Sequence, residues 1–226
     1  METWLTSTPR GAAQVELTLP EHAPAGLLAL GHGAGGGVDA PDLRAVRRAA
    51  LAAGLAVVRV TQPYRVAGRR APAPASHLDQ AWTATLNAVR AARERPWLRQ
   101  VPLVAGGRSS GARVACRTAT AVGAAAVVAL AFPLHPPGRP ERSRAEELDG
   151  AVPTLVVNGD RDPFGVPSPR PGVRVVVRPG ERHDLAHDPE AVAEAVLDFL
   201  REVLPAAMTP DETTGQLAGP LVHDTP

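Results

Sequence analysis

Short, uniformly apolar runs alternate with helix-like segments along most of the chain, and this alternation constrains the fold more than any other feature. Segments with apolar residues at three- and four-residue intervals, such as residues 77–95 and 189–204, separate several of these runs and predict amphipathic helices. Strands that are apolar on both faces and alternate with helices predict a mostly parallel sheet with helices on both sides. The runs that predict strands lie at residues 27–30, 55–60, 101–106, 124–132, 154–159 and 173–177.

The two ends of the chain differ from this alternating region. Two extended runs, residues 3–7 and 14–19, flank the turn residues Pro9, Arg10 and Gly11, and they predict an antiparallel hairpin that extends the sheet. The segment at 205–226 has no periodicity and is expected to be disordered. Residues 1–204 are therefore expected to form a single domain.

Two segments between the predicted strands have sequence signals of their own. Asp39, followed by Pro41, is expected to open a helix after the first glycine-rich segment. The stretch from 62 to 76 is rich in Pro, Arg and Gly, so it is expected to be irregular and exposed. Its arginines, Arg65, Arg69 and Arg70, are expected to be solvated or to meet an anionic substrate.

Composition excludes several classes of protein. The 24 basic residues are all arginine and are balanced by 23 acidic residues, which does not favour a nucleic-acid partner. The first ten residues lack the pattern of a secretory signal, and the longest apolar stretch, residues 119–134, is too short to cross a membrane. The only cysteine, Cys116, cannot form an internal disulfide and is expected to be buried. A cytoplasmic protein without a membrane partner is expected.

The sequence "GGRSSG" at 106–111 carries the strongest chemical signal. Gly107, Ser109 and Gly111 fit the pattern G-x-S-x-G between a predicted strand and a predicted helix, which is the context of a nucleophile elbow. The first N–H groups of that helix would face developing negative charge. Ser109 is therefore the candidate nucleophile, and the N–H of Ser110 is a candidate donor to an oxyanion.

A serine nucleophile needs a base, and the base needs a carboxylate that orients it. Both residue types follow later strands in the expected order. Asp160 and Asp162 come just after the strand at 154–159, and His183 lies in the loop after the next strand. Asp162 fits the usual G-x-x-D turn better, while Asp160 could hydrogen-bond its own turn or substitute for Asp162.

With these segments in this order, the chain resembles the α/β-hydrolases over residues 14–204. The segments "GHGAGG", "GGRSSGARVA", "GDRDPFG" and "ERHDL" resemble the small, lidless, dienelactone-hydrolase-like branch of predicted hydrolases. The resemblance implies a three-layer α/β-hydrolase sandwich, a catalytic triad and no cofactor. It also implies that the backbone N–H groups of Ala34 and Ser110 bind the oxyanion. The implied triad is Ser109, Asp162 and His183.

The sequence departs from that branch at two positions. Arg182 precedes His183 where the related pattern often has an acidic or small residue, and a cation there could lower the basicity of the histidine. Ser110 stands where a larger residue is commoner. Residues 133–153 are too few for a lid domain, which favours small or exposed substrates.

The segment "GHGAGGG" at 31–37 also fits G-x-G-x-x-G, so a dinucleotide site is an alternative. That fingerprint requires a helix that begins within the glycines and an acidic residue about 20 positions later. No acidic residue lies between Asp42 and Asp79, although Arg59 could accept a 2′-phosphate. A phosphate-binding P-loop is excluded because the chain has no lysine. In a hydrolase the same loop would present a main-chain N–H to the oxyanion, with His32 holding the loop.

Taken together, these residues predict a serine hydrolase that acts on a small ester or related acyl substrate. The alternative is a non-catalytic interaction module on a hydrolase fold, because relatives of this branch include a subunit of a chromatin complex. No metal is expected, since His183 and His187 have no third ligand near them in sequence.

Overall fold

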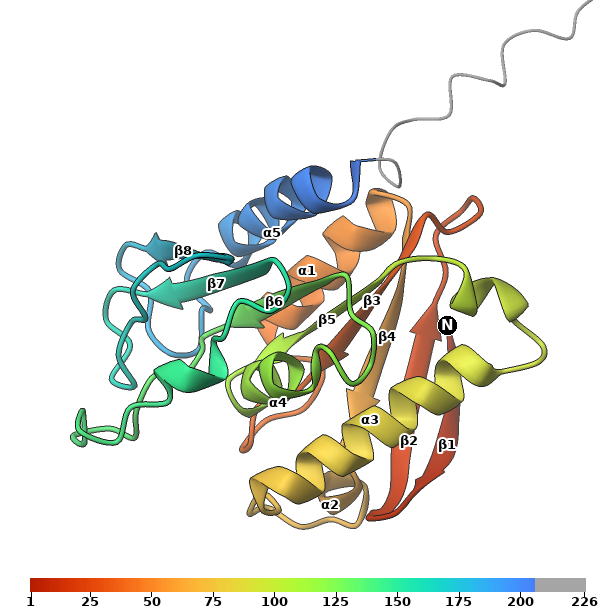
Figure 1. Ribbon diagram of the computed structural model, residues 1–226, viewed down its shortest axis with the longest axis horizontal. Coiled ribbons are helices and arrows are strands. Elements are labelled where there is room, and N and C mark those ends of the chain that lie inside the picture. Colours follow the sequence, from red (N-terminus) through yellow and green to blue (C-terminus); the bar gives the residue numbers. More distant parts are fainter. Residues whose placement is uncertain (206–226) are drawn as a thin grey trace, which may run out of the picture.

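The computed structural model describes residues 1–205, which form a mixed sheet with helices on both faces (Figure 1). Within these residues the sheet has eight strands in the order β1-β2-β4-β3-β5-β6-β7-β8. The pairs β1–β2 and β2–β4 are antiparallel, and all other pairs are parallel. This arrangement confirms the predicted mostly parallel sheet with an N-terminal hairpin. The strands are β1 Glu2–Thr8, β2 Gly11–Thr18, β3 Gly26–Gly31, β4 Leu55–Thr61, β5 Leu103–Arg108, β6 Ala126–Leu130, β7 Thr154–Gly159 and β8 Val173–Arg178.

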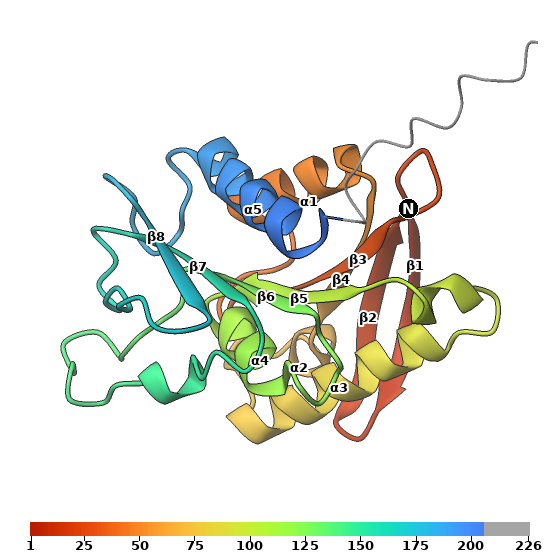
Figure 2. The same ribbon diagram turned by 45° about the horizontal axis from the view of Figure 1, so that its top comes forward.

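Helices cover the two faces of the sheet as separate layers, as Figure 2 shows. Helices α1 and α5 pack together on one face, and α3 and α4 pack together on the other. Each face has its own apolar cluster, so the central strands are buried on both sides. The helices are α1 Pro41–Ala52, α2 Pro63–Val66, α3 Ala75–Ala91, α4 Ser110–Thr118 and α5 Pro189–Val203, with 3-10 turns at Pro96–Arg99 and Ala145–Glu147.

The sequence of each element explains its position. Strand β3 (GLLALG) is buried at every residue, as a central strand of a two-sided sheet requires. Helix α5 buries a stripe of residues three or four apart, including Val192, Val196 and Phe199. Asp188 begins this helix as its N-cap, accepting a hydrogen bond from the N–H of Ala191 at 3.0 Å.

The structure corrects two expectations from the sequence. The segment 62–76 is not wholly irregular and exposed, because α2 begins at Pro63 and both Gln62 and Tyr64 are buried. Helix α2 was not predicted because proline interrupts the interior of a helix. Proline is nevertheless well suited to the first turn, where α2 has Pro63. Asp39 does not open helix α1: the residue before the helix is Ala40, and Asp39 forms an ion pair with Arg59 instead.

Residues 131–153, between β6 and β7, contain one short 3-10 turn and no lid domain. Among the described residues, none of the helices combines the length and apolar character needed to cross a membrane. The tail expected to be disordered lies, apart from Pro205, outside the described residues.

Candidate active site

Ser109 lies at the edge of the sheet, in a sharp turn that follows strand β5. Ser109 follows the last residue of β5 and precedes the first residue of α4, with φ 53° and ψ −111°. A positive φ is uncommon for a residue with a side chain, and such conformations persist where the surroundings hold them. This local geometry is that of a nucleophile elbow.

The glycines on either side of Ser109 permit a very close approach between the elbow and strand β3. A Cβ placed on Gly111 would lie 2.5 Å from the carbonyl oxygen of Gly31, and one on Gly107 would lie 2.7 Å from the same atom. Neither position has room for a side chain, because the opposing atoms belong to the backbone. The G-x-S-x-G pattern is therefore required by packing as well as by the turn.

Three polar side chains from separate segments form a hydrogen-bonded chain at this edge. The hydroxyl of Ser109 lies 2.9 Å from Nε2 of His183, and Nδ1 of His183 lies 2.8 Å from Oδ2 of Asp162. A carboxylate only accepts, so Nδ1 donates and Nε2 is left to accept the hydroxyl proton of Ser109. Asp162 is buried, whereas the His183 side chain is 20% exposed, so the chain of contacts runs from the interior toward solvent.

The neighbours of Asp162 fix its orientation. Its Oδ1 accepts a hydrogen bond from the N–H of Phe164 at 2.8 Å, and the Phe164 ring packs against the imidazole of His183 with centroids 4.1 Å apart. The buried amide of Asn158 lies 3.5 Å from Oδ2 of Asp162 and donates to the carbonyl oxygen of Gly165. Sequence analysis missed Asn158 and Phe164. Both lie in the same strand-to-loop segment as Asp162, which was the available signal.

Asp160 occupies a different position from Asp162. Its Oδ1 accepts a hydrogen bond from the N–H of Gly180 at 2.8 Å, and the side chain is exposed. Asp160 therefore joins the turn after β7 to the turn after β8. Of the two aspartates considered, Asp162 is the one that contacts His183.

The glycine-rich loop after β3 lies against the elbow. A Cβ placed on Gly33 would be 3.5 Å from Cβ of Ser109, so the loop backbone packs directly over that residue. Ala34 follows Gly33. Ser110 is the first residue of α4, and the first four N–H groups of a helix have no acceptor within the helix. The two N–H groups predicted from the sequence thus belong to segments that meet at Ser109.

His32 and Tyr64 hold this loop from behind. Nε2 of His32 accepts a hydrogen bond from the N–H of Gln62 at 3.0 Å, which leaves Nδ1 to donate to the carbonyl oxygen of Gly33 at 2.8 Å. Burial lowers the pKa of His32, which favours this neutral form. The Tyr64 hydroxyl donates to the carbonyl oxygen of Ala34 at 2.9 Å. Tyr64 was missed because its segment was expected to be exposed.

Arg108, immediately before Ser109, joins three segments around the site. Its Nη2 donates to the carbonyl oxygen of His183 at 2.8 Å, and its Nε lies 3.1 Å from Oδ2 of Asp42 in helix α1. The second contact is at ion-pair distance but lacks hydrogen-bond alignment. Burial raises the pKa of the fully buried Asp42 carboxyl to about 6, and the Arg108 guanidinium opposes that rise. Arg108 is far from both Asp42 and His183 in the sequence, so no local pattern indicated these contacts.

The remaining candidates do not join the site. The side chain of Arg182 is exposed, and that of His187 is also exposed. Buried Glu181 holds the loop after His183 by accepting hydrogen bonds from the N–H groups of His187 and Asp188. Cys116 is buried as expected.

The dinucleotide alternative does not fit the geometry of the glycine-rich loop. Helix α1 begins at Pro41, after the glycines rather than within them, so its N-terminus does not open from the G-x-G-x-x-G segment. Arg59 is buried, pairs with Glu16 and Asp39, and donates to the carbonyl oxygen of Val38. Its guanidinium is therefore engaged inside the protein rather than presented to a phosphate.

A mostly parallel sheet with helices on both faces, and a serine at the turn between a central strand and a helix, is the arrangement of the α/β-hydrolases. The chain belongs to the α/β-hydrolase family: the family model described as an alpha/beta hydrolase domain matches residues 24–175. Family membership supports a hydrolase activity in general. Among curated proteins, none matches the sequence significantly.

Solved structures with the same fold include several serine hydrolases. A serine hydrolase without a lid from Xanthomonas campestris is 22% identical, with a TM-score of 0.72 over 92% of this chain and 96% of that chain. A serine hydrolase homologue from Coxiella burnetii is 21% identical, with a TM-score of 0.69 over 88% and 97%. A dienelactone hydrolase from Anabaena variabilis is 19% identical, with a TM-score of 0.69 over 89% and 97%. At these identities the likeness establishes the shared fold.

Proposed function

We propose that the protein is a serine hydrolase that cleaves small esters or related acyl compounds through an acyl-enzyme on Ser109. The observation that carries this proposal is the continuous hydrogen-bonded chain from the Ser109 hydroxyl through His183 to buried Asp162. Serine alone is a weak nucleophile at neutral pH, and a base oriented by a carboxylate is what activates it.

In the proposed reaction, the Ser109 oxygen attacks the acyl carbonyl carbon while its proton passes to Nε2 of His183. The carbonyl oxygen becomes an oxyanion, which the N–H groups of Ala34 and Ser110 stabilise. The leaving group departs with the proton from His183. Water then attacks the acyl-enzyme, gives a proton to His183 and releases the acid, while Ser109 recovers its proton. Asp162 keeps the imidazole in the required tautomer, and no cofactor takes part.

The exposure of the site supports a small substrate. Residues 131–153 provide no lid, and the Ser109 side chain is only half-buried, so an acyl group reaches it from solvent. The Arg108 contact to the carbonyl oxygen of His183 holds the loop that carries this base.

A fluorophosphonate probe tests the nucleophile directly, because it reacts covalently only with an activated serine. We expect wild type and Ser110→Ala to be labelled and Ser109→Ala to remain unlabelled. Ser110→Ala is the matched control, since it removes the neighbouring hydroxyl and keeps the backbone N–H. Absence of labelling in the folded wild-type protein would contradict the proposal and favour a non-catalytic module.

A panel of short p-nitrophenyl esters, thioesters and lactones tests the reaction. With the best substrate, Asp162→Asn is expected to lower kcat by roughly 10⁴-fold, because the wrong histidine tautomer becomes favoured. Asp160→Asn, which alters a contact to Gly180 but not to His183, is expected to stay close to wild type. Equal losses in both variants would contradict the assigned role of Asp162.

A further inference from the structure

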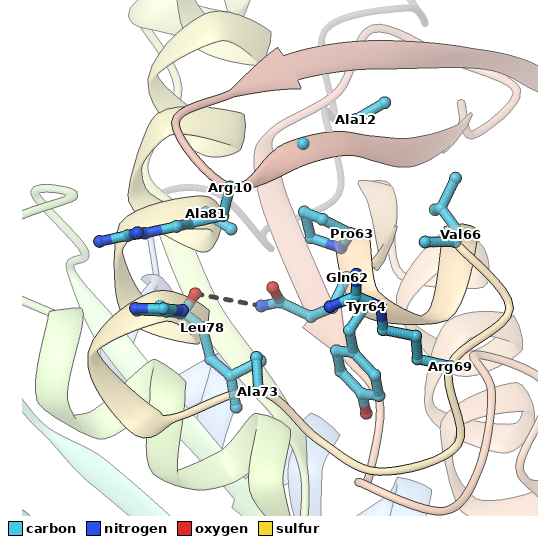
Figure 3. Close-up of a pocket in the computed structure, with 13 residues that line it drawn as sticks. Arg10, Ala12, Gln62, Pro63, Tyr64, Val66, Arg69, Ala73, Leu78 and Ala81 are labelled. Carbon is cyan, nitrogen blue, oxygen red and sulfur yellow. Dashed lines mark hydrogen bonds between the residues drawn. The ribbon is translucent and has the colours of Figure 1, made fainter.

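A cavity of about 300 Å³ lies behind the glycine-rich loop, between the turn before β2, helix α2 and the beginning of α3 (Figure 3). Its volume is at the lower end of the range of small-molecule pockets, about 300–1,000 Å³. The apolar part of its lining favours a hydrocarbon or aromatic group. That part includes Ala12, Pro63, Val66, Ala73, Leu78 and Ala81.

Two arginines lie among the residues that line this cavity. Arg10, Arg69 and His77 line the cavity, and no aspartate or glutamate does. The guanidinium of Arg10 donates to the neutral side chain of Gln80 at 2.7 Å, and within residues 1–205 neither Arg10 nor Arg69 forms an ion pair with a carboxylate. An arginine without an acidic partner beside an apolar cavity attracts an anionic group, and a carboxylate matches guanidinium geometry well.

The cavity is separated from Ser109. Tyr64 lines the cavity, and its hydroxyl donates a hydrogen bond to the carbonyl oxygen of Ala34 in the glycine-rich loop. The gap between the cavity and the elbow, lined by Gln62, Tyr64 and Ser110 among others, holds only about 10 Å³. That is room for about one water molecule. A ligand in the cavity does not reach the Ser109 hydroxyl through this gap.

We propose that this cavity is a binding site for a small apolar carboxylate, with the hydrocarbon part against the apolar lining and the carboxylate at Arg69. The site is distinct from the hydrolase centre and does not depend on the function proposed for Ser109. Its inner wall carries Gln62 and Tyr64, the two residues whose hydrogen bonds hold His32 and Ala34. A ligand in this cavity therefore contacts Gln62 and Tyr64, the two residues that hold the glycine-rich loop.

Nuclear magnetic resonance titration with 3-phenylpropanoate tests the chemical class. We expect saturable shifts at the amides of Ala12, Tyr64, Ala73 and Ala81, with a Kd in about the millimolar range for a ligand of this size. The matched neutral compound, 3-phenylpropanamide, is expected to bind several-fold more weakly, and added salt is expected to reduce that difference. No saturable shift, or equal binding of the two compounds, would overturn the proposal.

Two pairs of variants locate the site. Arg69→Ala is expected to raise the Kd for 3-phenylpropanoate by roughly two- to fivefold, as for an exposed ion pair. Arg70→Ala, one residue further along the same exposed segment and outside the lining, is the control that leaves it unchanged. Ala73→Phe fills the cavity and is expected to abolish binding, while Ala71→Phe, which is exposed and outside the lining, is not. Matching effects within either pair would contradict the location.

The separation from the hydrolase centre is tested with Ser109→Ala. This variant is expected to bind 3-phenylpropanoate with the wild-type Kd, and so is wild type whose Ser109 has reacted with the fluorophosphonate. Loss of binding in the reacted protein would show that the cavity belongs to the substrate site and would overturn this inference. Because the Ser109→Ala result is independent of labelling, failure of the proposed function leaves the binding test intact.

Discussion

Replacing Arg108 with methionine should destabilise the protein by an amount that depends on pH. Arg108 is the cation next to Asp42, whose side chain is fully buried and whose pKa burial raises to about 6. Removal of one partner from a buried ion pair costs about 3–5 kcal/mol, because the remaining charge is left uncompensated. We expect a loss of this size at pH 8, where Asp42 is ionised in wild type.

The loss should shrink at pH 5. One unit below the pKa, about nine-tenths of Asp42 carries a proton, so little uncompensated negative charge remains when Arg108 is removed. What remains is mainly the lost hydrogen bond to the carbonyl oxygen of His183, about 1–2 kcal/mol. The direction follows from linkage: a carboxyl whose folded pKa is raised above its unfolded value loses its stabilising contribution as pH rises through the folded pKa. As the pH rises from about 4 to above 6, ionisation of Asp42 should lower the free energy of unfolding of wild type by about 3 kcal/mol. The variant should lose more, over a pH range that extends higher, because Arg108 no longer opposes the rise in the Asp42 pKa.

Urea unfolding followed by circular dichroism at pH 5 and pH 8 measures both losses. Arg201→Ala is the control, because its pair with Asp198 is more than half exposed and should contribute below about 1 kcal/mol at either pH. Adding Asp42→Asn to Arg108→Met should remove the pH dependence. The same loss at pH 5 and pH 8 in the single variant would refute the reasoning.

Three further predictions have clear expected outcomes. Gly111→Ala should destabilise the protein by about 1–3 kcal/mol in urea unfolding, because its Cβ would meet the Gly31 backbone at 2.5 Å. Gly35→Ala, with nothing within 4 Å, should cost less than about 0.5 kcal/mol, and equal costs would contradict the packing argument. Cys116, the only cysteine, has a pKa that burial raises to about 12, so a thiol reagent should react only as the protein unfolds. Rapid reaction in native buffer would exclude this. Tyr64→Phe should cost about 0.5–1.5 kcal/mol by urea unfolding through the lost bond to Ala34, and an unchanged midpoint would show that the bond contributes little.

The sequence predicted what depends on local periodicity and on motifs at strand ends. Runs such as residues 154–159 are apolar throughout, so their place in a two-sided sheet follows from burial alone. Ser109 and His183 each follow a predicted strand, and the carboxyl ends of parallel strands meet at one edge. Their proximity was therefore predictable from the order of the elements, although their catalytic roles remain a proposal.

The contacts that support the site were not predictable in the same way. Arg108 and His183 are far apart in sequence, and nothing in either segment indicates that a guanidinium will hold the histidine carbonyl. Tyr64 follows a proline in a segment whose composition is typical of loops, so its burial depends on tertiary packing. Asp39 is of a residue type that is common at helix N-caps, but Arg59 in strand β4 pairs with its carboxylate instead.

The absence of side chains where Gly31 faces Gly107 and Gly111 has a consequence for engineering. Main chain rests on main chain there, so the spacing between the elbow and strand β3 cannot be adjusted by exchanging one residue for another of different size. A graft of this centre onto another scaffold would have to carry both segments together as one unit. Changes of substrate preference would have to be sought instead in the surrounding loops, such as residues 131–153, which border β6 and β7 and leave this joint untouched.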